Sequence, residues 1–297
     1  MSVYHIVFSP TGGTKKVSDI FTASFSSESI LIDLTERSRD FSSCSFAETD
    51  TCIVSVPSYG GRVPDIAVTR LRQMNGNGAS AILIAVYGNR AYDDTFAELQ
   101  DVLADSGFSC IAAVAAVAEH SIMRQYAAGR PNAQDAETLT RFAENIRAKM
   151  EAGSLSSHLN LPGNRPYREY GGVPLKPAAG KSCNRCGLCA DKCPTGAIDT
   201  ATPSQTDPKL CIWFFCVLDD DFTARAADFC QKRGNIDIQL QYFLICHLHH
   251  LPWFYVGNGK ILLLSRRMFQ KAAEPYRNSS FSFRPLQAFF SFRLAAA

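Results

Sequence analysis

Long apolar runs are missing from this 297-residue sequence: no stretch of about 18 uninterrupted apolar residues occurs, so the sequence predicts no membrane-spanning helix. An excess of charge of one sign is missing as well. The formal net charge is +2, which is too small for the basic surface of a nucleic-acid-binding protein. The stretch Met1–Phe8 is too short and too uncharged for a secretory signal peptide. We therefore expect a cytoplasmic protein of about two domains.

A disulfide framework is not indicated either. The chain has 11 cysteines, but without a secretion signal such a number favours metal ligation in a reducing compartment. Cys44, Cys52 and Cys110 lie outside the one dense run of cysteines. We expect these three to be small buried apolar side chains.

Short apolar runs alternate with amphipathic segments over residues 1–151. This alternation predicts a parallel sheet that helices cover on both faces. Five strands favour a flavodoxin-like, doubly wound α/β order. The expected strands are Val3–Phe8, Ser29–Leu34, Thr51–Val56, Ala81–Val86 and Cys110–Val117, and the expected helices are Lys15–Phe25, Asp65–Met74, Thr95–Ser106 and Asp135–Glu151.

A glycine-rich loop with three hydroxyl side chains joins the first expected strand to the first expected helix. It has neither the Walker spacing nor the G-x-G-x-x-G spacing. Backbone N–H groups at such a turn, together with the positive end of the helix, suit a phosphate group. The alternative is an ordinary strand-to-helix turn. The candidate phosphate-binding residues are Ser9, Thr11, Gly12, Gly13 and Thr14.

Two further loops place glycine and tyrosine just beyond the ends of the third and fourth strands, where open α/β sheets bind ligands. A tyrosine can stack on a flat ring, and glycine lets backbone amides approach the ring's polar atoms. The alternative is that the tyrosines only cap the sheet edge. All three loops together favour a flavin. The candidate ring-binding residues are Pro57, Tyr59, Gly60, Gly61, Tyr87, Gly88 and Asn89.

The densest cysteine run has the spacing C-x2-C-x2-C-x3-C-P, formed by Cys183, Cys186, Cys189, Cys193 and Pro194. This is the spacing that holds a [4Fe–4S] cluster in bacterial ferredoxins, where three thiolates bind one cluster and the fourth binds a second. A zinc site is the alternative, because paired C-x2-C motifs also bind zinc. The additional cysteine and the Cys-Pro ending favour the iron–sulfur cluster, and with it electron transfer.

These motifs together resemble the flavodoxin–ferredoxin fusion proteins, also called ferrodoxins, of anaerobic bacteria and archaea. The resemblance covers residues 1 to about 211 and includes Tyr59–Pro64, Tyr87–Tyr92, Glu119–Ser121 and Gly129–Pro131. It implies FMN on the first domain, two [4Fe–4S] clusters on the second and electron transfer between them. It also implies that the hydroxyl-rich loop holds the FMN phosphate, that the tyrosine loops flank the isoalloxazine ring, and that Cys183, Cys186 and Cys189 bind the first cluster.

The family pattern fails after Cys211. A second cluster motif would place cysteines at 214, 217 and 221, but the chain has Phe214, Val217 and Asp221. We favour a reading-frame slip near codons 212–216, and the alternative is a genuine extension with a decayed second cluster. The organisation that follows is a flavodoxin-like domain (1–151), a Gly/Pro/Ser-rich linker (152–180), a small, incomplete ferredoxin-like α+β module (181–221) and a tail of uncertain origin (222–297).

Three functions remain open from the sequence. The first is an electron-transfer iron–sulfur flavoprotein with one cluster, or two in the intact family pattern, and Cys211 as a further metal ligand. The second is an FMN-dependent reductase of a small substrate. The third is a binding module in which the cysteine run holds zinc and has no redox role. The expected partner is a redox protein or a small-molecule donor or acceptor, and no side chain is assigned as catalytic.

Overall fold

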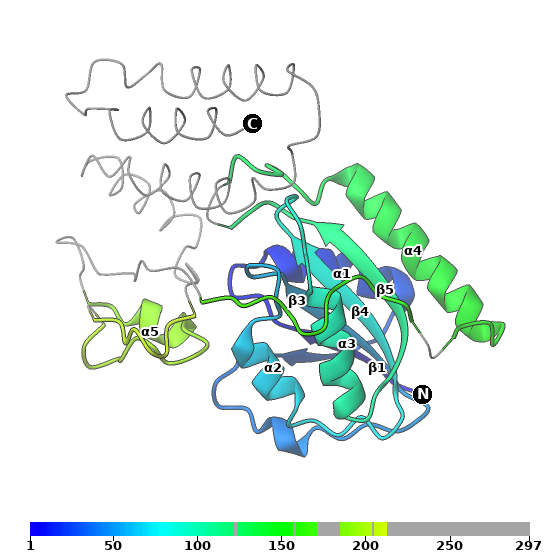
Figure 1. Cartoon of the computed structure of the whole chain (residues 1–297), viewed down its shortest axis with the longest axis horizontal. Coiled ribbons are helices and arrows are strands. Elements are labelled where there is room, and N and C mark those ends of the chain that lie inside the picture. The colour runs from blue at the N-terminus through cyan, green and yellow to red at the C-terminus, as the bar shows by residue number, and fades with distance from the viewer. Residues whose placement is uncertain (122–123, 157–158, 172–184, 204, 213–297) are drawn as a thin grey trace, which may run out of the picture. The chain divides into compact units, whose positions relative to one another are not determined.

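The computed structural model describes residues 1–121, 124–156, 159–171, 185–203 and 205–212. A five-stranded parallel sheet in the order β2-β1-β3-β4-β5 forms the centre of the N-terminal part (Figure 1). This is the flavodoxin-like doubly wound order, so the expected fold class is confirmed. The strands are β1 (Val3–Val7), β2 (Ile30–Asp33), β3 (Thr51–Pro57), β4 (Ser80–Tyr87) and β5 (Ser109–Val117).

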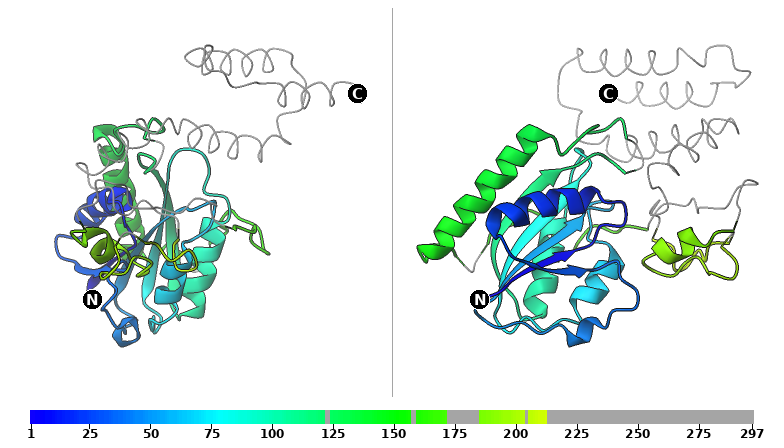
Figure 2. Two further views of the ribbon diagram at one scale, coloured as in Figure 1. Left: turned by 90° about the vertical axis from the view of Figure 1, so that its left-hand side faces the viewer. Right: turned by 180° about the vertical axis from the view of Figure 1, so that it is seen from behind.

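Four helices cover the two faces of the sheet, α1 and α4 on one side and α2 and α3 on the other (Figures 1 and 2). All four were expected, but two begin earlier. For α4 the reason is a capping box, in which the Asn132 side chain accepts from Asp135 N–H and the Asp135 carboxylate accepts from Asn132 N–H. The helices are α1 (Gly13–Phe25), α2 (Asp65–Leu71), α3 (Thr95–Asp105) and α4 (Ala133–Glu151), and η1 (Phe41–Ser43) is a short 3-10 turn.

Strands β3 and β4 are buried on both faces, which explains their almost continuous apolar sequences. In β3, Cys52 and Val54 pack on the α2/α3 side, whereas Ile53 packs on the α1/α4 side. Cys44, Cys52 and Cys110 are buried, as expected for apolar side chains. Burial raises the pKa of Cys110 to about 11, so this thiol is protonated at neutral pH.

The cysteine-rich segment contains one short helix, α5 (Leu188–Lys192), and an antiparallel bridge between Ile198 and Thr206. The Asp207 N–H donates to the Ala197 carbonyl at 2.7 Å, which closes the intervening loop. No helix in the described ranges is both long and apolar enough to cross a membrane. Cys183 and the predicted tail (222–297) lie outside the described residues.

A buried polar chain lies beneath α1. His5 Nε2 is 2.6 Å from Ser18 Oγ, which is 2.6 Å from Ser55 Oγ. Burial lowers the pKa of His5, and the nearby Asp19 carboxylate opposes this effect. His5 is therefore neutral in the folded chain at pH values at which the same imidazole is already protonated in the unfolded chain.

Acidification below about pH 6.5 should therefore reduce the free energy of unfolding, because the unfolded state takes up a proton that folded His5 does not. Urea unfolding of the whole chain at about pH 7 and pH 5.5 measures the change. His5→Gln should show a smaller loss of stability over this range. Identical pH dependence of wild type and variant would mean that His5 makes no contribution.

Candidate functional site

The loop after β1 has the geometry of an anion-binding turn. Gly12 adopts a left-handed conformation with φ of 82°, and α1 begins at the next residue. Lys15 N–H donates to Ser9 Oγ at 2.8 Å, and Gly12 N–H donates to the Ser9 carbonyl at 3.3 Å. Ser9 thus shapes the turn by accepting hydrogen bonds, while its hydroxyl proton can still be donated to a ligand.

The electrostatics of this turn favour an anion. The first turn of α1 contains no acidic residue, so no carboxylate neutralises the positive helix end. Thr14 is buried at 6% exposure and Thr11 is half-buried, so both residues are packed into the turn. A Cβ on Gly13 would lie 3.8 Å from the Ala118 Cβ, so the end of β5 closely flanks the loop.

The loop after β3 is a tight turn built on two glycines. Tyr59 N–H donates to the Arg62 carbonyl at 2.9 Å, and Arg62 N–H donates back to the Tyr59 carbonyl at 3.1 Å. Gly60 and Gly61 have φ of 58° and 84°, so both central residues lie in the region that only glycine enters freely. The Gly-Gly pair, which was predicted for its access to a ligand, is thus also required by the turn.

The loop after β4 carries an aromatic cluster. The Tyr87 and Tyr92 rings are 5.3 Å apart and nearly perpendicular, and Tyr92 meets Phe96 of α3 in the same way at 5.1 Å. Asn89 is exposed, with φ of 62°. Because β1, β3 and β4 are adjacent parallel strands, their three following loops meet at one edge of the sheet.

The loop after β5 completes this edge from the side. A Cβ on Gly88 would lie 2.6 Å from the His120 ring, so the imidazole packs directly on that glycine. Burial lowers the pKa of His120, and the Arg90 cation lowers it further. The Glu119 carboxylate accepts from Gly129 N–H at 2.7 Å. These contacts give Glu119 and His120 structural roles at the loop edge.

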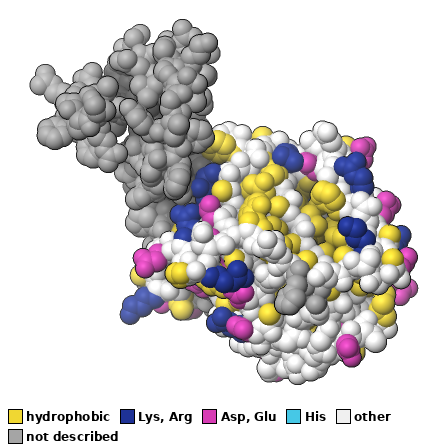
Figure 3. Space-filling model, turned by 45° about the vertical axis from the view of Figure 1, so that its right-hand side comes forward, with side chains coloured by type: hydrophobic (Ala, Val, Ile, Leu, Met, Phe, Trp, Pro, Cys, Tyr) yellow, Lys and Arg dark blue, Asp and Glu magenta, His cyan; other side chains and the backbone are white. Residues whose placement is uncertain are grey.

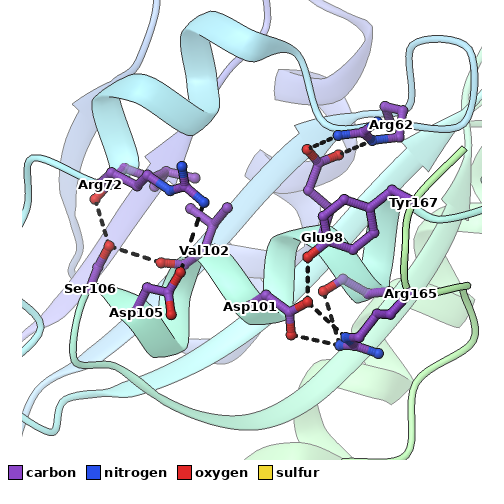
Figure 4. Close-up of polar contacts among 11 residues, drawn as sticks. Arg62, Arg72, Glu98, Asp101, Val102, Asp105, Ser106, Arg165 and Tyr167 are labelled. Carbon is purple, nitrogen blue, oxygen red and sulfur yellow. Dashed lines mark hydrogen bonds and ion pairs between the residues drawn. The ribbon is translucent and has the colours of Figure 1, made fainter. Parts of the chain in front are cut away.

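Segment 159–171 lies within the predicted linker (152–180), but the structure packs it against the flavodoxin-like part. Arg165 and Tyr167 contact Asp101 of α3 (Figure 4). Arg168 contacts Arg62 in the loop after β3 and Asp93 in the loop after β4. The Gly, Pro and Ser content of the segment's surroundings concealed these contacts. The only indication of these contacts in the sequence is the pair of arginines within the predicted linker, Arg165 and Arg168.

The cysteines of the candidate metal site surround α5. Gly187 adopts φ of 81° and starts the helix, with Cys186 before it, Cys189 within it and Cys193 at its end. Cys186 is exposed, Cys189 is half-buried, and Cys193 is buried. Cys211 follows the loop that Asp207 closes. The three cysteines around α5 are therefore held on one short turn of chain.

The donor set fits an iron–sulfur cluster in its chemistry. Thiolates are the ligands of [4Fe–4S] clusters, and Cys183, Cys186, Cys189 and Cys193 supply only sulfur. Among the described residues, no three Cys, His, Asp or Glu side chains are gathered as a metal site. Cys183 lies outside the described residues, so the structure describes only three of the four sulfur donors of this run.

Two arginines from the flavodoxin-like part donate to the backbone of this cysteine run. Arg70 of α2 is 7% exposed, and its Nη2 donates to the Pro194 carbonyl at 2.7 Å. Arg37 Nη1 donates to the Ala190 carbonyl at 3.0 Å. Positive charge thus lies next to the backbone on both sides of Cys193.

A separate pocket lies between β5 and α4 and is distinct from the loop edge. It follows the middle of β5 rather than its carboxyl end, and its lining is mostly aliphatic. Figure 3 shows hydrophobic side chains gathered on one face of the molecule. The pocket is lined by Ala112, Ala113, Val114, Ala115, Phe142, Asn145, Ile146, Lys149 and Leu155.

Comparison with known proteins identifies the cysteine run and gives structural neighbours of the N-terminal half. Residues 181–199 match the family model of a 4Fe-4S binding domain, and this range includes all four cysteines of the run. A search of curated proteins found no match.

Several solved structures resemble about half of this chain. A flavodoxin from Streptococcus pneumonia TIGR4 is 22% identical and aligns over 50% of this chain and 99% of its own, with a TM-score of 0.35. Flavodoxin 1 from Bacillus cereus is 15% identical over 49% and 97%, with a TM-score of 0.36. Rubredoxin oxygen:oxidoreductase from Desulfovibrio gigas is 15% identical over 51% and 36%, with a TM-score of 0.37. The order of the strands, rather than these low scores, defines the fold as flavodoxin-like.

Proposed function

We propose that this chain is an electron-transfer iron–sulfur flavoprotein, with FMN at the loop edge of the sheet and a [4Fe–4S] cluster on the cysteine run. The observation that carries the proposal is the presence in one chain of a flavodoxin-like sheet and a 4Fe-4S binding motif at 181–199. A flavin exchanges one or two electrons, whereas a cluster exchanges one. A protein with both groups can therefore couple two-electron and one-electron reactions.

The loop after β1 is assigned to the FMN phosphate. Backbone N–H groups at the start of α1 and the hydroxyls of Thr11 and Thr14 would donate hydrogen bonds to its oxygens. Ser9 would hold the turn in shape through the Lys15 N–H. The first turn of α1 contains no carboxylate that would repel a phosphate dianion, and this supports the assignment.

The ring of the flavin is assigned to the loops after β3 and β4. Tyr59 and Tyr87 would offer aromatic surface, and the backbone of Gly60, Gly61, Gly88 and Asn89 would supply polar contacts. Pro57 ends β3 and directs the chain into the first of these loops. No described side chain at this edge is assigned as an acid or base, which suits electron transfer.

Cys183, Cys186 and Cys189 are assigned as ligands of the first cluster, with Cys193 and Cys211 as further candidates. The guanidinium groups of Arg37 and Arg70 stabilise added negative charge nearby, which would raise the reduction potential of a cluster there. The number of clusters depends on whether residues 212–297 are the native sequence. Resequencing of the gene around codon 212 tests the proposed frame slip.

Chemical analysis of the purified whole chain tests the proposed function. After anaerobic reconstitution, heat should release FMN, and acid should release sulfide in proportion to iron. Release of an adenine dinucleotide alone would exclude FMN. Stoichiometric zinc without sulfide would favour the binding module in which the cysteine run holds zinc.

Replacing both Thr11 and Thr14 by valine should weaken FMN binding while it preserves side-chain shape. Each lost hydrogen bond to a charged phosphate should cost about 1.5–3 kcal/mol of binding free energy. Fluorescence titration of apo-protein with FMN measures this loss. Thr138→Val on α4 is the matched control, since Thr138 bonds only within its own helix in the described structure. Equal FMN affinity of the double variant and wild type would exclude this loop as the phosphate site.

A further inference from the structure

Segment 159–171 is fixed to the start of α3 by one buried carboxylate. Asp94 is 1% exposed and accepts hydrogen bonds from three donors of the segment. Asn164 donates from its N–H and its Nδ2 at 2.7 and 3.0 Å, and Arg168 donates from its N–H at 2.7 Å. Burial alone would raise the pKa of Asp94, but these hydrogen bonds lower it below its ordinary value. The segment thus has a defined path over α3.

A second carboxylate further along α3 holds the same segment. Asp101 accepts two hydrogen bonds from Arg165, both at 2.7 Å, and one from the Tyr167 hydroxyl (Figure 4). Burial raises the pKa of Tyr167 to about 12, and the Asp101 carboxylate contributes to this rise. Tyr167 is therefore a neutral donor at physiological pH, and its ring lies 4.8 Å from the Arg62 guanidinium.

Arg62 connects the segment to the loop after β3. Its guanidinium makes a paired contact with Glu98 of α3, at 2.8 and 2.7 Å, and donates a third hydrogen bond to the Arg168 carbonyl at 2.7 Å. Glu98 also accepts from Val63 N–H at 2.8 Å. The turn that contains Gly60 and the segment are therefore held by the same ion pair. Asp93, in the loop after β4, pairs with Arg168 at 2.6 Å, so the segment is bonded to both loops.

The result of this attachment is that Tyr170 lies on Gly60. A Cβ on Gly60 would be only 2.2 Å from the ring carbons Cδ2 and Cε2 of Tyr170, so glycine is needed for the ring to lie there. Tyr170 is nevertheless 40% exposed, which leaves part of its aromatic surface open. The ring is thus an available aromatic surface beside the turn assigned to the flavin.

We propose that Tyr170 is a flavin-contacting residue, supplied to the loop edge from outside the sheet by segment 159–171, with Arg62 as the residue that positions it. The proposal rests on the proposed function, because it assumes that FMN binds at this edge. An aromatic side chain next to a conjugated ring gains stacking or edge-to-face contact and quenches its fluorescence. Segment 159–171 is then part of the cofactor site rather than only a connection to the cysteine run.

Titration of the whole apo-chain with FMN, followed by flavin fluorescence, tests this proposal. Tyr170→Ala should raise the dissociation constant about 3–10-fold, the loss expected for one aromatic contact, and should make bound FMN brighter. Tyr170→Phe should behave like wild type. Phe142→Ala on α4 is the matched control, because Phe142 is 39% exposed and lines the pocket beside the middle of β5 instead of the loop edge.

The possible failures are distinguishable. If wild type binds FMN and Tyr170→Ala changes neither affinity nor brightness, Tyr170 is not a flavin contact, while the proposed function stands. Tighter binding by Tyr170→Ala would also overturn the proposal, because it would mean that the ring blocks the site. Failure of wild type to bind FMN would overturn the proposed function and this assignment together.

Discussion

Replacing Cys186 by serine should prevent assembly of the iron–sulfur cluster. Cys186 is exposed, lies two residues before the start of α5 and is assigned as a direct ligand. Changes to groups that only support a metal ligand cost about 10–100-fold in metal affinity, so loss of the ligand itself should cost more. Iron and acid-labile sulfide per chain, measured after anaerobic reconstitution, should fall at least about tenfold.

Cys44→Ser is the matched control for this variant. Cys44 is buried and follows η1 in the flavodoxin-like part, so its replacement should leave iron and sulfide content unchanged. The control also separates ligand loss from a general effect of removing one thiol. Equal cluster content in Cys186→Ser and Cys44→Ser would contradict the assignment of Cys186.

Glu98→Ala should cause a large loss of stability. Glu98 is 4% exposed, and its carboxylate receives hydrogen bonds from Arg62 and from Val63 N–H, so its removal leaves a partly buried guanidinium without its carboxylate partner. Breaking such a pair costs about 3–5 kcal/mol, and the partial exposure of Arg62 favours the lower end. The corresponding fall in melting temperature is about 6–12 °C. Thermal unfolding of the apo-chain measures it.

Glu36→Ala provides the comparison with an exposed ion pair. Glu36 lies 3.5 Å from Arg39, and their side chains are 50% and 33% exposed, far more than the Glu98 side chain at 6%. An exposed pair of this kind contributes about 0–1 kcal/mol, so this variant should melt close to wild type. Similar melting temperatures for Glu98→Ala and Glu36→Ala would show that the Glu98–Arg62 pair contributes little to the stability of the fold.

The sheet was predictable because its central strands, β3 and β4, are buried on both faces. Mostly apolar sequences such as Thr51–Val56 favour a central parallel strand. The alternation of strands and helices predicts how the strands are connected. The observed helix ends differ from the predicted ends by up to three residues. The capping box at Asn132 extends α4 by two residues, and α2 ends at Leu71 instead of Met74.

The candidate site was only partly predictable. The three loops followed from their positions after β1, β3 and β4, because carboxyl ends of parallel strands meet at one edge. Segment 159–171 did not follow, since its contacts join residues such as Arg62 and Arg168 that are far apart in sequence. The sequence also does not indicate which group packs against a glycine, where other residues carry a Cβ. Gly60 and Gly61 accommodate Tyr170 and Asp93, contacts that only the tertiary structure reveals.

An anaerobic reductive titration of the reconstituted whole chain tests the central claim most directly. Dithionite should bleach both the flavin bands and the broad iron–sulfur absorption, with about two electrons taken up per FMN and about one per cluster. The account predicts both contributions in the same sample, in proportion to the measured FMN and sulfide. Uptake of no electrons beyond those of the flavin, with zinc bound to the cysteine run, would contradict it.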